Sequence, residues 1–596
     1  MNRRYFLRAA GLTMAATQTN AVGALRMPES KLTATEIPLP QWAQTGNFVF
    51  MGLDGGPLEA QKGLRSGWQG FSRDDPQGIV RAVHEFYRPE NVEIPRAAGA
   101  TWVYVTWSNG WSKERERRDQ WSEAARFIKE CQKDGLHVSA YISAANMFWE
   151  DYLPNVPQSL KWIDTQQPSL MRHYGGSLYR VMANLKLADW RREIKTAIDS
   201  ALDAGVEGFW IDNMFWWHSW PLFQDFMSEM RAHAARRKSE VVWHTNVNRG
   251  IYHWARVGNV VGTEDGRAPK YTPGDSPAIS SNLGLLSYLA GLREGWRSAE
   301  LEHYGLNLSA PVRQLMIAEG WLWQVGTTWF PVDRLLQARW HRREPEAWKI
   351  LTEMGRYNRH YLKHGEYFKP GEALASVGII GHAGGVSEEP DAQKLSMDGQ
   401  SRMIELLDRL AGWNIQYEVL FEDRLSSESL RKFAVLVLSD PDHIPSGLAE
   451  SLKAYLQRGG RLIAPERTWL SSLGGNTIFL PQAAFVPNKE PELLRNAIRK
   501  YDDSPAVEAA APPSIVYRGL RQGGRVLLHL LNYQMEPVEP FTVHLRGNAK
   551  SVAALIPESG EIKPLKSRQE GGRTVVSVPE FPIHCLLVFN GLGPGT

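Results

Sequence analysis

Cysteine is almost absent from this chain of 596 residues, which contains only Cys131 and Cys585. Two cysteines so far apart in the sequence predict neither a disulfide framework nor a zinc site with closely spaced thiol ligands. No second histidine stands at ligand spacing from His244. We therefore expect no metal and no cofactor.

An excess of one charge is also lacking, because 68 basic residues face 65 acidic ones and the formal net charge is +3. Residues 1–24 contain Arg3, Arg4 and Arg8 and no acidic residue, so their removal brings the formal charge to zero. A neutral chain offers no electrostatic basis for binding nucleic acid or an anionic membrane. We expect neither as a partner.

The N-terminal segment NRRYFLRAAGLTMAATQTNAVGA combines paired arginines with a short, mildly apolar run that ends in small residues. It resembles a twin-arginine export signal, residues 1–24, with cleavage after Ala24. The apolar run is too short to span a bilayer. The resemblance implies a periplasmic location for the mature chain; a disordered basic tail is the alternative.

Tryptophan is abundant, and 21 of the 23 tryptophans lie between Trp42 and Trp348. In this region short apolar strands alternate with amphipathic helices, and the helices at 117–135 and 187–205 end in glycine, a natural C-cap. Such alternation predicts a parallel sheet, and closure into a (β/α)8 barrel over 31–365 is the economical form. A doubly wound open sheet is the alternative, but no glycine-rich phosphate loop follows the first strand. The eight strand signals lie at 48–56, 101–107, 136–143, 206–213, 241–246, 259–265, 301–307 and 326–330.

Two further units follow the barrel. Residues 372–480 read as a smaller α/β unit, and 505–592 contain short strands and turn residues typical of an antiparallel β-sandwich. The segment 487–513 reads as a linker. The smaller unit resembles the amidotransferase-like (flavodoxin-like) middle domain of family-42 β-galactosidases. Its strand FAVLVLSDPD offers Asp440 and Pro441 where an amidotransferase needs a cysteine nucleophile. The resemblance therefore implies a non-catalytic domain, with a homo-oligomer through it by analogy.

Polar and aromatic residues recur at the ends of the predicted barrel strands, where a barrel places its chemistry. The segment GVEGFWIDN fills the core with Phe209 and Ile211 and then presents Asp212. Water is restricted around an acid in such aromatic surroundings, which is how a barrel tunes a carboxylate. The sixth strand ends in Glu264 and Asp265, of which pleating directs only one to the cavity. We expect substrate contacts from Asp54, Trp107, Tyr141, Trp210, Asn213, His244, Asn246, Glu302, His303 and Trp329.

Glycoside cleavage needs two carboxyl groups, one on each side of the anomeric carbon. An aspartate after strand four with an acid after strand six resembles retaining α-galactosidases and α-glucosidases, and GFWIDN is similar to the strand-four motif of α-L-fucosidases. This resemblance to the glycoside-hydrolase barrels implies Asp212 as nucleophile and Glu264 or Asp265 as acid/base, acting on a poly- or oligosaccharide. Each also has a structural reading: Asp212 as a turn cap, and Glu264 or Asp265 as an ion-pair partner of Arg267 or Arg249.

Family-42 enzymes depart from this pattern, since they use a glutamate after strand four and another after strand seven. Here Glu302 could serve after strand seven, but strand four ends in Asp212. Chemistry resides in the site and not in accessory domains, so the spacing decides for a retaining enzyme with an aspartate nucleophile. A β-glycosidase using Glu302 and a non-catalytic carbohydrate-binding protein on a degenerate barrel are the alternatives.

Overall fold

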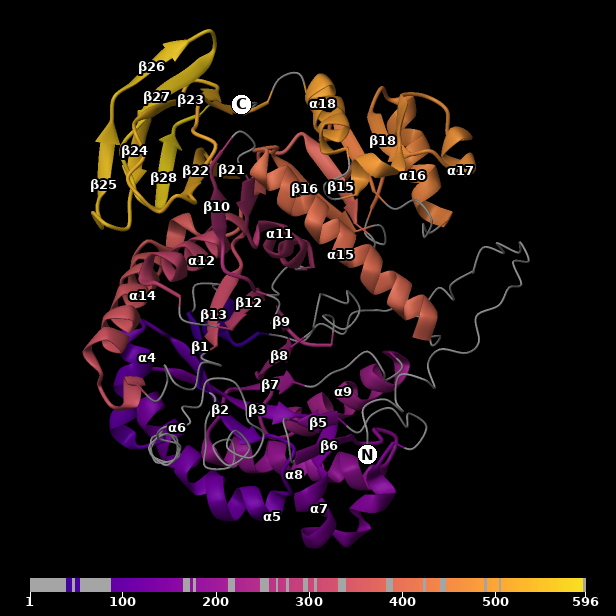
Figure 1. The fold of residues 1–596 in the computed structure, drawn as a ribbon, viewed down its shortest axis with the longest axis vertical. Coiled ribbons are helices and arrows are strands. Elements are labelled where there is room, and N and C mark those ends of the chain that lie inside the picture. Colours follow the sequence, from indigo (N-terminus) through magenta and orange to yellow (C-terminus); the bar gives the residue numbers. More distant parts are fainter. Residues whose placement is uncertain are drawn as a thin grey trace. The chain divides into compact units, whose positions relative to one another are not determined.

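The structure is a computed structural model (Figure 1). The elements discussed below belong to one compact unit, Glu36–Thr596. The expected export signal, residues 1–24, lies outside the described residues. The structure describes residues 39–44, 49–53, 87–164, 172–174, 178–212, 220–246, 257–263, 266–274, 278–292, 298–304, 308–330, 339–381, 390–421, 425–439, 446–486, 490–502 and 505–592.

Eight parallel strands close into a barrel in which sequence order and spatial order agree. Each barrel strand pairs in parallel with the next barrel strand along the chain, and β1 pairs with β13 to close the ring. The predicted barrel is therefore present. Its strands are β1 (Phe50–Leu53), β2 (Trp102–Ser108), β3 (His137–Ser143), β7 (Gly208–Asp212), β8 (Val242–Asn246), β9 (Val260–Thr263), β12 (Ser298–Tyr304) and β13 (Gly326–Phe330).

Amphipathic helices cover the barrel, as the 3.6-residue spacing of their apolar positions requires. Helix α8 (Ala188–Ala204) buries Trp190, Ile194 and Ile198 along one face and ends at Gly205, whose φ of 100° suits glycine. The other helices around the barrel are α4 (Glu93–Ala97), α5 (Lys113–Glu116), α6 (Ser122–Lys133), α7 (Trp149–Asn155), α9 (Trp220–Ala235), α11 (Leu283–Leu292), α12 (Ala310–Trp323) and α14 (Pro345–Lys363). Of these, α11 and α12 are not amphipathic, since they are buried along nearly their whole length. Small sheets add β4 (Asn146–Phe148), β5 (Arg172–Tyr174), β6 (Leu178–Met182), β10 (Lys270–Thr272) and β11 (Ala278–Ser280).

Large aromatic side chains fill the barrel interior. Phe50, Trp102, Tyr104 and Trp210 form one buried cluster with Val242 and Val260. A glycine in the wall makes room for them: a Cβ at Gly208 would lie 2.5 Å from Ser139 Oγ and 2.8 Å from Val242 Cβ. The short helix α1 (Gln41–Gln44) adds Trp42, which stacks on His137 at the start of β3. The tryptophan-rich region thus builds a core that supports the strand ends.

The middle unit contains a five-stranded parallel sheet in the order β16-β15-β17-β18-β19. Starting from the first strand in sequence, this is the 2-1-3-4-5 order of doubly wound sheets. Its strands are β15 (Val377–Gly381), β16 (Tyr417–Phe421), β17 (Val435–Leu438), β18 (Arg461–Pro465) and β19 (Thr477–Leu480), with helices α15 (Pro390–Gly412), α16 (Ser446–Gln457) and α17 (Thr468–Ser471).

The expected linker at 487–513 is wrong. Residues Pro491–Tyr501 form helix α18, which buries Leu494 and Ile498 one turn apart and has a proline at its start. Val507–Ala509 form strand β20, which pairs with β23. The polar and proline-rich composition of this segment concealed a short amphipathic face, which the spacing of its apolar residues could have indicated.

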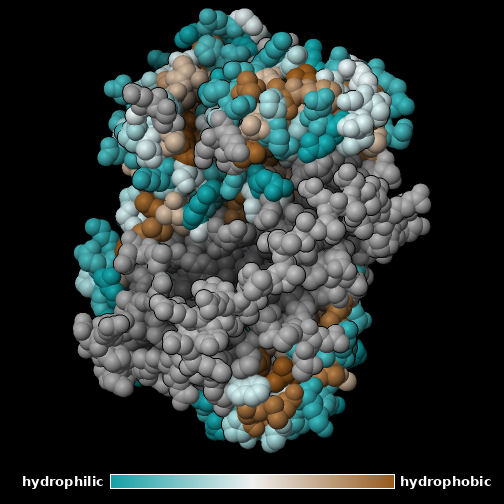
Figure 2. Space-filling model, turned by 45° about the vertical axis from the view of Figure 1, so that its right-hand side comes forward, coloured by the Kyte–Doolittle hydropathy of each residue, from teal (hydrophilic) through white to brown (hydrophobic). Residues whose placement is uncertain are grey.

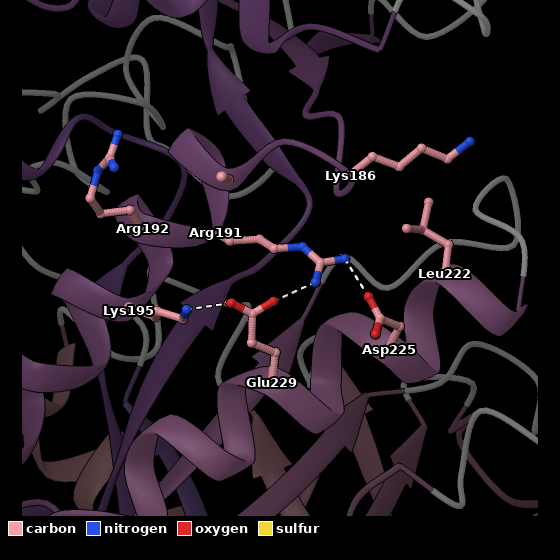
Figure 3. A pocket seen from close by; sticks show the side chains of 8 residues that line it. Lys186, Arg191, Arg192, Lys195, Leu222, Asp225 and Glu229 are labelled. Carbon is pink, nitrogen blue, oxygen red and sulfur yellow. Dashed lines mark hydrogen bonds and ion pairs between the residues drawn. The ribbon is translucent and has the colours of Figure 1, made fainter.

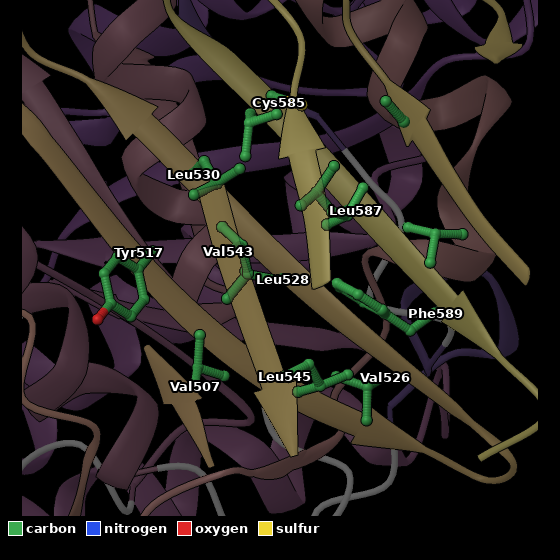
Figure 4. Close-up of a cluster of buried hydrophobic side chains, with 14 of the residues drawn as sticks. Val507, Tyr517, Val526, Leu528, Leu530, Val543, Leu545, Cys585, Leu587 and Phe589 are labelled. Carbon is green, nitrogen blue, oxygen red and sulfur yellow. The ribbon is translucent and has the colours of Figure 1, made fainter. Parts of the chain in front are cut away.

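Two antiparallel sheets form the C-terminal part and share one core (Figure 4). Val543 and Leu545 of one sheet pack in this core with Leu528, Leu587 and Phe589 of the other. The first sheet contains β20, β23 (Phe541–Arg546), β26 (Ser567–Glu570) and β27 (Arg573–Val578); the second contains β14 (Glu372–Ala373), β21 (Ile515–Gln522), β22 (Arg525–Asn532), β24 (Ser551–Leu555), β25 (Ile562–Leu565) and β28 (His584–Asn590).

The surface drawn in Figure 2 is mostly hydrophilic where the chain is described, with hydrophobic residues in small groups. Across the described ranges, the exposed large hydrophobic side chains are Leu160, Phe479, Leu493 and Ile562, which belong to different elements. Single exposed apolar residues are normal on a folded surface. No described helix is both long and apolar enough to cross a membrane.

Candidate active site at the carboxyl end of strand four

Asp212 is the last residue of β7, the fourth barrel strand, and its side chain is partly exposed. Each carboxylate oxygen accepts a hydrogen bond from a neighbouring strand. The Tyr141 hydroxyl on β3 donates to Oδ2 at 2.6 Å, and the Asn246 amide on β8 donates to Oδ1 at 2.9 Å. A carboxylate that is both reachable and held by two donors is suited to chemistry at a fixed position.

The strand register explains why these three residues meet. Tyr141 is in register with Trp210, and Trp210 with His244, so positions two residues further along β7 and β8 are Asp212 and Asn246. Side chains on alternate positions share a face of the sheet, which places all five groups inside the barrel. Sequence reasoning named Tyr141 and Asn246 as substrate contacts; the structure shows both bound to Asp212.

Trp210 and His244 lie below this level, in the core. Trp210 is fully buried and stacks on Tyr104, with ring centroids 4.7 Å apart and planes 10° apart. His244 is fully buried between Phe50, Trp102 and Trp210, at centroid distances of 5.3 to 5.9 Å. Burial lowers the pKa of His244 to about 3, so its imidazole is neutral at pH 7. The expectation that these two side chains contact substrate is wrong.

Trp107 is a second correction, because it faces the helix layer. Its indole Nε1 donates to Ser200 Oγ of α8 at 2.9 Å, and its ring stacks on Trp121. Alternation along β2 explains this: Trp102 and Tyr104 point inward, so Trp107 points outward. Sequence alone did not separate the two faces, because both faces of a barrel strand are buried.

The remaining expected site residues fall into two groups. Asp54, Asn213, Glu264 and Asp265 lie outside the described residues. For Glu302, His303 and Trp329 the structure gives the backbone register alone. Glu302 pairs with Thr328, and two residues earlier Glu300 pairs with Gly262, which in turn pairs with Asn246.

Position 302 is therefore on the same face of the sheet as Asn246. Positions 303 and 329 pair with each other, and 329 pairs with Met51. The side chains of His303 and Trp329 lie outside the described part of the structure, so their substrate contacts stay predictions.

Three buried carboxylates fix the loop that follows β2. Glu116, Asp151 and Glu193 each accept a backbone N–H from residues 109–113, at 2.6 to 3.4 Å. Burial raises the pKa of Glu116 well above its ordinary value and that of Glu193 to a lesser degree. Acids with raised pKa values often mark catalytic sites. Here their oxygens are occupied by the loop backbone, so we assign them a structural role.

A surface groove of about 720 Å³ lies between α8 and α9 (Figure 3). Arg191 bridges two acids there, binding Asp225 at 2.7 Å and also Glu229. Lys195 pairs with Glu229 as well. These ion pairs join the two helices on the outside of the barrel, away from the inner face that carries Asp212. The groove is therefore not the candidate active site.

Within the described ranges, no group of three or more histidine, cysteine, aspartate or glutamate side chains is arranged to hold a metal ion. The chemistry that the described residues can support is that of a positioned carboxylate. Because Asp212 is the end of a strand, its backbone is fixed by the barrel and not by a loop.

The fold, which includes a closed (β/α)8 barrel, is similar to that of solved glycoside hydrolases. The chain is similar to an α-L-fucosidase isoenzyme 2 from Paenibacillus thiaminolyticus, with a TM-score of 0.65 at 10% sequence identity, over 92% of this chain and 100% of the other. It is also similar to a β-galactosidase from Rahnella sp. R3, with a TM-score of 0.58 at 11% identity, over 91% and 98% of the two chains.

A β-galactosidase from Bacillus circulans sp. alkalophilus gives a TM-score of 0.56 at 11% identity, over 91% of this chain and 99% of the other. No family model and no curated protein matches the sequence. At this level of identity the likeness shows the fold, and the site must carry any functional argument.

Proposed function

We propose that this protein is a retaining glycoside hydrolase that uses Asp212 as its nucleophile and acts on a poly- or oligosaccharide. One observation carries the proposal: the carboxylate at the end of strand four is partly exposed and is held by Tyr141 and Asn246 on the neighbouring strands. The solved structures of similar fold, a fucosidase and β-galactosidases, support the same class of chemistry.

In the first step, an Asp212 oxygen attacks the anomeric carbon, the glycosidic C–O bond breaks, and an acid gives its proton to the leaving oxygen. In the second step the residue that acted as the acid is now a base. It takes a proton from water as the water oxygen attacks the anomeric carbon. The bond to Asp212 breaks and its electron pair returns to the carboxylate. Two inversions give net retention of configuration.

Glu264 or Asp265 would supply the acid and base. Val260 of β9 packs in the interior cluster, so alternate positions along this strand are on the inner face. Glu264 and Asp265 both lie beyond the described end of β9 at Thr263, so both are tested as the acid/base. Single Glu264→Gln and Asp265→Asn variants test this: loss of activity toward substrates with poor leaving groups, with activity retained toward activated aryl glycosides, identifies the acid/base.

A second candidate is a β-glycosidase that uses Glu302. The register that places position 302 on the same face as Asn246 favours it, and the β-galactosidases of similar fold are consistent with it. Comparing Glu302→Gln with Asp212→Asn separates the two. In our proposal Asp212 forms the covalent intermediate, whereas in the alternative Glu302 does.

A panel of aryl glycosides that includes fucosides and galactosides, together with bacterial polysaccharides, tests the function directly. We expect turnover by the wild type, and proton NMR should show a first-formed product of retained configuration. Saturable sugar binding without any release from the panel would favour a non-catalytic carbohydrate-binding protein.

We further propose export to the periplasm, tested by fractionation and N-terminal sequencing. We also propose a homo-oligomer through the middle unit, tested by light scattering.

A further inference from the structure

We propose that Tyr141 and Asn246 are positioning residues for Asp212, which stabilise its carboxylate as it departs from the glycosyl-enzyme intermediate and therefore control the second chemical step. This inference rests on the proposed function. It replaces the expectation from sequence that both residues bind sugar hydroxyl groups.

The two donors reach Asp212 from opposite sides. In the barrel, β7 lies between β3 and β8, and each neighbour contributes one donor to one oxygen. Both oxygens are thereby held from the strand side, and the plane of the carboxylate is fixed. Each oxygen accepts one of these two hydrogen bonds.

Burial separates a positioning role from a sugar-binding role. Tyr141 is 7% exposed and Asn246 is 4% exposed, whereas Asp212 is partly exposed. The Tyr141 ring packs against Trp210 at a centroid distance of 4.8 Å and near Tyr104 at 6.0 Å. The hydroxyl is therefore presented by a packed ring, and little of either donor is left for a ligand to contact.

The charge on Asp212 changes in opposite directions in the two steps. Glycosylation converts the carboxylate to an ester and removes its charge, so hydrogen bonds to that charge weaken. Deglycosylation returns the electron pair to the carboxylate, so the same bonds strengthen toward the transition state. Donors aimed at developing charge lower the barrier of the step in which the charge appears. Tyr141 and Asn246 should therefore accelerate the second step more than the first.

The test is transient-state kinetics of Tyr141→Phe with an aryl glycoside that has a good leaving group. We expect kcat to fall about 10- to 100-fold, as for loss of a hydrogen bond to a developing charge. KM should fall in parallel, so kcat/KM stays within about threefold of the wild type. A burst of aryl alcohol, stoichiometric with enzyme, should appear as the intermediate accumulates. Asn246→Ala should show the same signature.

Tyr104→Phe is the matched control, since it removes the hydroxyl of another tyrosine of the barrel interior that packs on Trp210. We expect it to show no burst. A higher KM with unchanged kcat in Tyr141→Phe would mean sugar contact and would overturn the inference. Equal losses in kcat and kcat/KM without a burst, in both Tyr141→Phe and Tyr104→Phe, would mean a structural role and would also overturn it.

Asp212→Asn distinguishes failure of this inference from failure of the proposed function. An inactive Asp212→Asn beside a Tyr141→Phe with normal kinetics rejects the positioning role alone. An Asp212→Asn with wild-type turnover, or a wild type that releases no aryl alcohol from any glycoside of the panel, rejects both. Melting temperatures of all variants show whether each is folded.

Discussion

Two carboxylates of this chain, Asp212 and Glu319, accept hydrogen bonds from similar donors but differ in their exposure to solvent. Glu319 of α12 is fully buried and accepts from the Tyr533 hydroxyl at 2.7 Å and from the Asn282 side-chain amide at 2.7 Å. Asp212 also accepts from a tyrosine and an asparagine, but it is partly exposed at a strand end.

The difference shows that a tyrosine and an asparagine around an acid do not by themselves make an active site. Burial raises the pKa of Glu319 to about 7, a value that would suit a general acid or base. Its partners come from segments far apart in the chain, since Tyr533 follows β22 and Asn282 precedes α11. We interpret Glu319 as a structural link between the barrel helices and the C-terminal sheets. Exposure to solvent separates the two sites.

The largest effect that we expect is a loss of catalytic turnover when Asp212 is replaced. Asp212→Asn should lower kcat/KM by about 10⁴-fold or more, as for loss of a nucleophile, while the melting temperature changes little. Glu319→Gln should leave kcat/KM within about threefold of the wild type, because this side chain has no access to substrate. Steady-state kinetics and thermal unfolding of both variants check the pair. Comparable catalytic losses in the two would contradict the distinction.

Much of this comparison could be anticipated from the sequence, and part could not. The run GFWIDN indicated a buried strand that ends in an acid facing the cavity, because four apolar or small residues precede Asp212. The seventh strand was expected at 301–307 but spans Ser298–Tyr304, since its apolar pattern is weak. Glu319 was not recognised, because its partners are brought together only by contacts between distant segments. Alternation within each strand would have identified Tyr141 and Asn246 as neighbours of Asp212 once the strand ends were aligned.

For the free energy of unfolding, in contrast to turnover, Glu319 should matter more than Asp212. Glu319→Ala removes the hydrogen bond from the Tyr533 hydroxyl and both hydrogen bonds from Asn282, whose side-chain amide keeps the Arg267 carbonyl as an acceptor. We expect a loss of about 2–3 kcal/mol in the free energy of unfolding. Glu346→Ala, an exposed position of α14, should cost less than about 0.5 kcal/mol and serves as the control. Urea denaturation followed by fluorescence measures both. Equal midpoints for the two variants would reject the link.

The pH dependence of the free energy of unfolding should further test the role of Glu319. Burial lowers the pKa of His360 and of His529 to about 3, and that of His584 well below its ordinary value. These imidazoles charge first in the unfolded chain, so their contribution is complete above pH 6.5 and is lost as the pH falls below it. Glu319 acts in the opposite sense: its folded pKa is raised, so its contribution is complete below pH 4.5 and is lost as the pH rises toward 7.

Between pH 4.5 and 6.5 the histidines with a lowered pKa, His244 and His341 among them, oppose the buried acids Glu319, Glu116 and Glu193. The test is therefore the slope of each variant relative to the wild type. Glu319→Gln removes one of the contributions that oppose the histidines, so its melting temperature should fall more steeply than that of the wild type as the pH falls over this range. His584→Gln should make the decline shallower than in the wild type. Melting temperatures at half-unit steps of pH measure the slopes; parallel curves for all three proteins would contradict the assignment.

The smallest effect is expected in the groove between α8 and α9 (Figure 3). Glu229→Gln removes the ion pairs with Arg191 and Lys195, which are only partly buried. Pairs of this kind contribute about 0–1 kcal/mol, and salt screens them. We expect a shift within that range, reduced further at high ionic strength, with no change in kcat/KM. A loss of turnover in this variant would mean that the groove and not Asp212 belongs to the active site.

Identification of the residue that carries the covalent intermediate tests the central claim most directly. Tyr141→Phe should accumulate the glycosyl-enzyme, which can be quenched in acid, digested and sequenced by mass spectrometry. We predict a glycosyl adduct on Asp212, in the peptide that contains GFWIDN. An adduct on Glu302, or an enzyme that turns over substrate without any adduct and with inversion at the anomeric carbon, would contradict the account.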